Sequence, residues 1–292
     1  MKNGVLVIDK PSGFTSHDIV SIARRALKTK KIGHTGTLDP DATGILVLCV
    51  GKATKLVPYG TAAGKTYETT LKLGTRTDTY DKSGEVIDQS NKLVSSEDVI
   101  NVINTFIGEQ KQIPPMYSAI KIDGKKLYDL ARRGITVERE ARNIAIYNIY
   151  DIKIFFPHVS FVVECSSGTY IRSLIDDIGQ KLGTWAHMVQ LRRTSVGNIG
   201  EDLAISVETL KEFYDSEDVP ALIPMEVLVE HIPVKQLDSL TCESLLNGQW
   251  IPINNAENGE TFRLQDDKEL LGILEVITRD GKKYLKIKRG LV

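Results

Sequence analysis

Residues 33–44 read Gly-His-Thr-Gly-Thr-Leu-Asp-Pro-Asp-Ala-Thr-Gly, and residues 45–50 continue as Ile-Leu-Val-Leu-Cys-Val. The glycines, threonines and proline of the first stretch disfavour a regular element, whereas the apolar run after it predicts a buried strand. Pro40 also biases Asp39 toward an extended backbone. The sequence therefore predicts a shaped loop, held against the core, that presents the Asp39 carboxylate at a fixed place.

The composition is that of an ordinary globular protein, and 292 residues suffice for one large domain or a large domain plus a small one. No apolar run approaches the roughly 18 to 20 residues of a membrane span, and the N-terminus leads into a short strand pattern instead of a signal-peptide core. The three cysteines are widely spaced, which favours reduced structural thiols over a disulfide framework or a zinc site. We expect a cytoplasmic monomer with no membrane contact.

The formal net charge of -1 hides an uneven distribution of charge. Lysines and arginines gather in residues 24–31, 121–142 and 282–289, whereas residues 201–230 are strongly acidic. Two interpretations of the basic segments remain open: they are ordinary solvated faces, or they form a surface that follows the phosphates of a nucleic acid.

Hydrophobic patterns along the chain predict alternating helices and strands. The clearest are a strand over residues 4–10, a helix after a capping box at Thr15 and Asp18, a strand over 65–73, and a helix that starts at Ser95 and stops at Gly108. Further on, two β-rich runs over 144–165 precede a helix that ends at Gly183. Residues 114–142 are basic, with paired prolines at the start and only one short amphipathic patch, around Leu127 to Ala131. They are predicted to leave the core as an insertion.

From about Val234 the pattern changes to short strands and turns. We therefore place a domain boundary near Pro233. The predicted fold class is α+β, with a mixed, largely antiparallel sheet in a main domain over residues 1–233 and a small β-rich domain over 234–292.

The string from Gly33 to Gly44 closely resembles the catalytic loop of the TruB family of tRNA pseudouridine synthases. The resemblance extends over nearly the whole chain, down to a C-terminal region similar to the small PUA-like, RNA-binding domain of that family. The other matching motifs are Lys10-Pro11-Ser12-Gly13, Lys65-x-Tyr67, residues 114–119 with 124–128, Cys165 to Arg172, and Leu191-Arg192-Arg193.

This resemblance implies an enzyme that flips uridine 55 out of the T-loop of the tRNA T-arm and isomerises it to pseudouridine, with no cofactor and no metal. Asp39 would be the catalytic residue, and Arg172 would pair with it and keep it ionised. The remaining implied substrate contacts are the stacking residues Tyr67 and Tyr170, His34 in the space that the base leaves, and Leu191 against the flipped uridine.

The residues by themselves leave other interpretations open. An isolated Asp-Pro is more often a turn than a catalytic site, Arg172 could form a surface pair with Asp176 one helical turn away, and Tyr67 could be a core aromatic. Asp39 and Asp41 could serve a metal-dependent phosphohydrolase, although no accompanying phosphate-binding motif supports it. A non-catalytic protein that binds or folds tRNA would keep the basic segments without needing Asp39.

Overall fold

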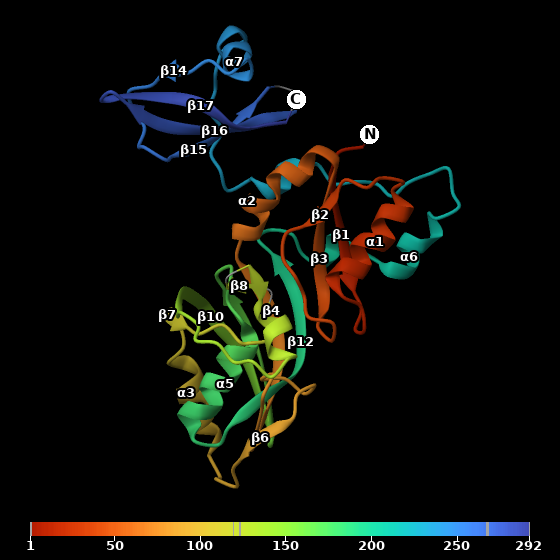
Figure 1. The fold of residues 1–292 in the computed structure, drawn as a ribbon, viewed down its shortest axis with the longest axis vertical. Coiled ribbons are helices and arrows are strands. Elements are labelled where there is room, and N and C mark those ends of the chain that lie inside the picture. Colours follow the sequence, from red (N-terminus) through yellow and green to blue (C-terminus); the bar gives the residue numbers. More distant parts are fainter. Residues whose placement is uncertain (1, 119, 123, 267–268, 292) are drawn as a thin grey trace.

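The computed structural model describes residues 2–118, 120–122, 124–266 and 269–291. In this part of the chain a nine-stranded sheet runs in the order β13-β1-β3-β12-β4-β11-β10-β7, with β2 paired to β3 (Figure 1). Only the β1–β13 and β3–β12 pairs are parallel. Its strands are β1 (Gly4–Lys10), β2 (Ile32–His34), β3 (Thr43–Val50), β4 (Lys65–Leu73), β7 (Gly108–Gln112), β10 (Arg142–Phe155), β11 (His158–Cys165), β12 (Ala186–Val196) and β13 (Ala204–Ser206).

A separate four-stranded antiparallel sheet at one end of the molecule has the order β14-β17-β16-β15 (Figure 1). The predicted α+β fold class, with a largely antiparallel main sheet and a small C-terminal one, is therefore confirmed. Its strands are β14 (Ile251–Pro252), β15 (Thr261–Gln265), β16 (Leu270–Arg279) and β17 (Lys282–Gly290), and two further strand pairs are β5 (Thr75–Thr77) with β6 (Val86–Gln89) and β8 (Lys121–Ile122) with β9 (Lys125–Lys126).

The helices cover different parts of the main sheet (Figure 1). Apolar residues of α3 and α5 share a core cluster with β4, β10, β11 and β12, and those of α1 and α6 share another with β1 and β3. The helices are α1 (Ser16–Ala26), α2 (Val57–Ala62), α3 (Ser96–Asn104), α4 (Leu127–Ala131), α5 (Ile171–Leu182), α6 (Val207–Glu212) and α7 (Ser239–Leu246), with 3-10 turns η1 (Gly51–Leu56), η2 (Glu201–Leu203) and η3 (Met225–Leu228).

Strand β3 is buried on both faces, as its continuous apolar run predicts. Leu46 and Leu48 pack with α1 and α6, whereas Ile45 and Val47 pack on the opposite side with η1, η3 and two residues of β16, Leu270 and Ile273. The loop that precedes β3 is thus attached to the most deeply buried strand of the main sheet.

Several local predictions agree with the structure. The capping box of α1 is formed by Thr15 and Asp18, and α5 ends at Gly183 in the left-handed conformation, with φ 70°. On β4, Tyr67 and Thr69 lie on the buried face, whereas Glu68 between them is exposed.

Other features differ from the sequence-based expectations. Helix α3 ends at Asn104 rather than at Gly108, which begins β7 instead. Within the insertion, by contrast, the one short amphipathic patch around Leu127 to Ala131 agrees with the structure: it forms α4, with Leu127 and Leu130 buried. No described helix has the length and apolar character needed to cross a membrane.

Gly44 provides a stability test, because its φ of +95° and its neighbours both exclude a side chain. A Cβ at this position would clash with the backbone of Arg193 on the neighbouring strand. We expect Gly44→Ala to lower the free energy of unfolding by about 3 kcal/mol, from strain plus overpacking. Gly108→Ala is the matched control: its φ is +110° with nothing within 4 Å, so it should cost only about 1 kcal/mol in chemical denaturation. Equal losses in the two variants would contradict a close approach at Gly44.

Candidate active site

A cavity of about 310 Å³ lies where the loop before β3, strands β4 and β12, and the start of α5 meet. Its volume is at the lower end of the range for small-molecule sites, and suits a single base. The cavity brings together five of the six predicted site residues, which come from four separate parts of the chain: Asp39, Tyr67, Tyr170, Arg172 and Leu191.

The loop that carries Asp39 is fixed from both sides by hydrogen bonds. The Ser16 hydroxyl, at the start of α1, accepts from the Leu38 N–H (2.8 Å) and donates to its carbonyl (3.1 Å). The Pro40 carbonyl accepts from the Gly13 N–H (3.0 Å) and from the Lys10 ammonium (3.0 Å). Lys10 is fully buried, and burial lowers its pKa to about 8. These bonds make the Lys10 to Gly13 turn a support for the Asp39 loop.

Asp39 and Arg172 form a two-point ion pair. Arg172 Nε lies 2.9 Å from Asp39 Oδ2, and Nη2 donates to Oδ1 at 3.2 Å. The guanidinium also donates to the carbonyls of Thr79 (3.2 Å) and Tyr117 (2.8 Å), and lies 3.7 Å from a carboxylate oxygen of Asp81. Every nitrogen of this buried side chain therefore has a partner, which holds the guanidinium plane against Asp39.

The open alternative that pairs Arg172 with Asp176 does not occur. Asp176 instead accepts from Arg76 Nε (2.7 Å) and Nη2 (2.9 Å), which ties β5 to α5. Arg172 is only 6% exposed, so it is not a surface residue.

The Asp39 carboxyl combines burial with access to the cavity. Its side chain is 39% exposed, and that exposed part faces the cavity it lines. Removal of the loop from bulk water raises the pKa of Asp39, the Arg172 charge opposes this shift, and Asp81 adds to it. Arg172 thus favours the ionised form of the Asp39 carboxylate, against the upward pKa shift that burial causes.

The two predicted tyrosines both line the cavity, Tyr67 from β4 and Tyr170 from the start of α5. Tyr67 on β4 is 7% exposed, and burial raises the pKa of its hydroxyl, with the Arg193 charge as the main opposing influence. Tyr170 is the N-cap of α5 and is half-buried, and burial likewise raises its pKa. The Gln112 side chain fixes the Tyr170 backbone by accepting from its N–H (2.8 Å) and donating to its carbonyl (3.0 Å).

Leu191 lines the cavity, whereas His34 does not. Leu191 on β12 is 8% exposed and belongs to the same apolar cluster as Tyr67. His34 lies on the short strand β2, is half-buried, and is not part of the cavity lining. Its Nδ1 has no hydrogen-bond partner among the described residues, and burial, followed by the Arg193 charge, lowers its pKa. His34 is therefore the one predicted site residue that the structure does not bring into the cavity.

Sequence reasoning assigned no role to three other polar residues of the cavity, Thr35, Lys65 and Arg193. A signal was present for two of them. Lys65 is two positions from Tyr67 on β4, and Arg193 is two positions from Leu191 on β12, so each shares a strand face with a predicted site residue.

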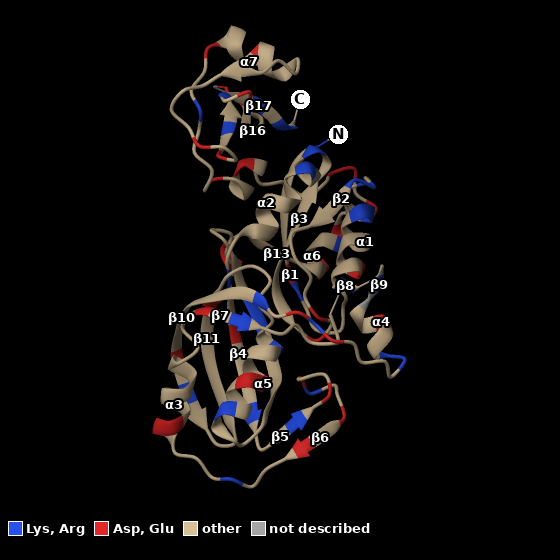
Figure 2. Cartoon of the chain, turned by 60° about the vertical axis from the view of Figure 1, so that its left-hand side comes forward, with Lys and Arg blue, Asp and Glu red and all other residues tan. Residues whose placement is uncertain are grey.

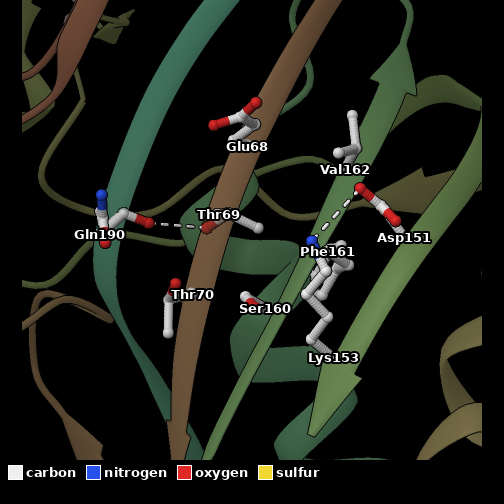
Figure 3. Close-up of a pocket in the computed structure, with 9 residues that line it drawn as sticks. All are labelled: Glu68, Thr69, Thr70, Asp151, Lys153, Ser160, Phe161, Val162 and Gln190. Carbon is white, nitrogen blue, oxygen red and sulfur yellow. Dashed lines mark hydrogen bonds and ion pairs between the residues drawn. The ribbon is translucent and has the colours of Figure 1, made fainter.

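A second hollow lies on the other face of β4, where Glu68 and Thr70 point away from the buried face (Figure 3). Its charged lining residues are Glu68, Asp151 and Lys153, and Lys153 lies 3.5 Å from Asp151. With two acids and one paired cation, this hollow is not suited to a polyanion.

The metal-site interpretation of Asp39 and Asp41 is not supported by the geometry. Both Asp39 oxygens face Arg172, and Asp41 is exposed. In the parts of the chain that the structure describes, no three His, Cys, Asp or Glu side chains gather as metal ligands would.

Comparisons with known proteins agree with the geometry. The model for the TruB family pseudouridylate synthase N-terminal domain matches residues 24–171, and that for the tRNA pseudouridylate synthase B C-terminal domain matches residues 172–230. The tRNA pseudouridine synthase B of Alkaliphilus oremlandii (strain OhILAs) is 43% identical, covering 99% of this chain and 98% of its own length. That of Clostridium tetani (strain Massachusetts / E88) is 42% identical, covering 98% and 99% respectively.

Among solved structures, a Cbf5-Nop10-Gar1 complex contains a chain that superimposes with a TM-score of 0.78 and 28% identity, covering 99% of this chain and 85% of that one. The two family models and the near-full-length relatives show that the protein is a pseudouridine synthase. The chain belongs to the TruB family, as the sequence motifs predicted, and is an intramolecular isomerase.

Arg172→Met tests the ion pair. Without the guanidinium, burial and Asp81 act unopposed, so the pKa of Asp39 rises further and the acid limb of the pH–rate profile moves to higher pH. We expect single-turnover isomerisation at neutral pH to fall by about 10² to 10³. Arg76→Met removes a similar two-point pair outside the cavity, and should lower the melting temperature while leaving the rate within about threefold. A drop of similar size in both variants would mean that Arg172 is only structural.

Proposed function

We propose that this enzyme isomerises uridine 55 in the T-loop of tRNA to pseudouridine by a base-flipping route without a cofactor. One observation carries the proposal: Arg172 holds the Asp39 carboxylate in two-point contact at the wall of a cavity of about 310 Å³ that is lined by two tyrosines. The closely similar relatives are tRNA pseudouridine synthases, which supports tRNA as the substrate.

The target base leaves its stack before the reaction, at a cost of a few kcal/mol. Stacking on an aromatic ring contributes about 1 to 3 kcal/mol per base, so Tyr67 and Tyr170 offset much of that cost. Leu191 adds an apolar contact on the cavity wall. His34, whose Nδ1 has no described partner, occupies the space that the base vacates in the RNA.

Asp39 acts at the ribose, where it allows the bond between C1′ and N1 to break and C5 to take the place of N1. Only the ionised carboxylate serves as a nucleophile or base, and the Arg172 contact favours that form. Substrate and product are isomers, so the site needs no redox partner and no group donor.

Affinity for tRNA comes from basic segments outside the cavity. Figure 2 shows lysines and arginines on several elements, among them α1, the β8–β9 pair and β17. We assign residues 1–233 to the catalytic domain, with the insertion at about 114–142 gripping the RNA, and residues 234–292 to a PUA-like domain that binds tRNA away from the target. The enzyme then acts as a cytoplasmic monomer on the T-arm.

A role in folding tRNA is the second candidate, because the exposed basic segments do not depend on Asp39. Under this view the protein would bind tRNA and assist its folding, and the reaction would be secondary.

Pseudouridine mapping of an unmodified tRNA transcript tests the activity, and Asp39→Asn tests its mechanism. The wild type should modify the T-loop uridine, whereas Asp39→Asn should lose turnover and keep tRNA binding within about threefold, because phosphate contacts elsewhere supply the affinity. Modification at another position would refute the substrate assignment. An Asp39→Asn rate within tenfold of the wild type would return Asp39 to the role of a turn residue.

The insertion supplies a salt-dependence test. Lys125, Arg132 and Arg133 are exposed, and none forms an ion pair among the described residues. Their joint replacement by glutamine should flatten the logarithmic dependence of tRNA affinity on salt by up to about 2.7 units, at 0.7 to 0.9 per phosphate contact. The melting temperature should barely change. Lys153→Gln, on the opposite face of the sheet, is the control and should leave the slope unaltered; a triple variant that is destabilised with the wild-type slope would show that the insertion is a structural subdomain.

A further inference from the structure

Two buried cations line the cavity with no acid to balance them. Arg193 is 1% exposed and Lys65 is 8% exposed, and neither forms an ion pair with a carboxylate in the described part of the chain. Isolated buried charges are costly, so a buried cation is normally paired. The contrast with Arg172, which has two carboxylates nearby, indicates that Lys65 and Arg193 have a different task.

Backbone carbonyls hold both cations in place. Lys65 Nζ donates to the carbonyls of Thr61 (2.8 Å) and Ala63 (2.6 Å), and the Arg193 guanidinium donates to those of Ile45 (2.7 Å) and Gly36 (3.2 Å). Neutral carbonyls fix the position of a cation and leave its charge uncompensated. The two groups are therefore preorganised for an anion that the protein itself does not supply.

Gly36 shows that the two cations converge. A Cβ built on this glycine would lie 3.5 Å from Arg193 Nη1 and 3.7 Å from Lys65 Cε. The charges of Arg193 and Asp39 both act on the Tyr67 hydroxyl, in opposite directions, so Tyr67 lies within reach of the cationic side and of the Asp39 side. A base stacked on Tyr67 with its ribose at Asp39 would thus extend toward the two cations.

Thr35 adds an unpartnered hydroxyl to this side of the cavity. It is 1% exposed and lines the cavity, and its Oγ1 has no hydrogen-bond partner among the described residues. A Cβ on Gly60 would lie 2.7 Å from the Thr35 methyl group, so that methyl packs closely on α2 and fixes the side chain. A buried hydroxyl left without a partner needs one from the ligand.

We propose that Lys65, supported by Arg193 and Thr35, is a further catalytic residue that binds the carbonyl edge of the uracil and stabilises its negative charge while the base is detached from the ribose. The inference rests on the proposed isomerisation. The substrate's phosphates are the other anions available, but they stay at the mouth of the cavity, whereas Lys65 and Arg193 are buried.

The charge arises from the bond changes themselves. When the C1′–N1 bond breaks, its electron pair stays on the base and is shared by the O2 and O4 carbonyls. When C5 bonds to C1′, the base supplies that electron pair, and the proton that C5 loses is replaced by one gained at N1. The product is an isomer of the substrate, and the base is anionic only between the two steps, which is when a fixed cation lowers the barrier.

The protonation of Lys65 agrees with this role. Burial, followed by the Arg193 charge, lowers the pKa of Lys65 to about 8, and Cys165 is the other titratable group that acts on it. Lys65 is therefore charged at neutral pH and loses its charge as the pH rises through about 8. The rate of the wild type should fall over the same range.

Lys65→Met tests the assignment in single-turnover reactions with saturating enzyme. We expect the rate to fall by about 10² to 10³ while the tRNA dissociation constant stays within twofold. Lys55→Met is the matched control, since Lys55 also donates its ammonium to a backbone carbonyl, that of Gly290 (2.6 Å), but lies outside the cavity; its rate should not change. Thr35→Val should lower the rate up to about tenfold, the effect of one hydrogen bond.

If Lys65→Met fails to fold, the pH dependence of the reaction rate of a second variant, Lys65→Arg, still tests the inference. Lys65→Arg retains the charge and should move the alkaline limb of the rate to higher pH. The inference is overturned if the alkaline limb of the pH–rate profile is unchanged in Lys65→Arg. It is also overturned if a folded Lys65→Met variant reacts within threefold of the wild-type rate. If the wild type forms no pseudouridine, the proposed function itself is refuted. If Asp39→Asn is inactive but Lys65→Met reacts normally, only the role of Lys65 is refuted.

Discussion

The ion pair between Asp39 and Arg172 joins residues 133 positions apart in the sequence, and the other parts of the site are arranged around it. A buried guanidinium is tolerated only when its donors are satisfied. Satisfying them places the carbonyls of Thr79 and Tyr117 beside the Asp39 loop, so one side chain fixes the loop before β6 and the start of the insertion. The geometry of the carboxylate therefore depends on tertiary contacts from the whole main domain.

The site lies where the two parallel neighbours β3 and β12 meet. Gly44 faces the backbone of Arg193 across this pair, which brings the Asp39 loop next to the cationic side of the cavity. The buried centre of the sheet thus supplies precise positions for the chemistry. We propose that the exposed basic segments supply charge for binding RNA. They do so without constraining those positions, because exposed charges contribute little to stability.

Features that depend on neighbouring residues could be predicted from the sequence, whereas features that depend on contacts between distant segments could not. Local patterns predicted the capping box at Thr15, the alternation of β4 and the end of α5 at Gly183, since these depend on neighbouring residues. The resemblance to a family predicted the pairing of Arg172 with Asp39. The spacing of Arg193 from Leu191 indicates a shared strand face, but an Arg-Arg sequence indicates a surface. Only the pairing of β12 with β3 and β4 shows that this face is buried. The position of His34 on β2 likewise depends on pairing with β3.

We propose that a uridine leaves its RNA and enters the cavity with its ribose at Asp39. A crystal structure of the Asp39→Asn variant bound to a T-arm stem-loop would show whether it does. We expect the target base inside the cavity, stacked on Tyr67, with C1′ nearest to residue 39 and the carbonyl edge toward Lys65. A base that remains stacked in the RNA, with the cavity unoccupied, would contradict it.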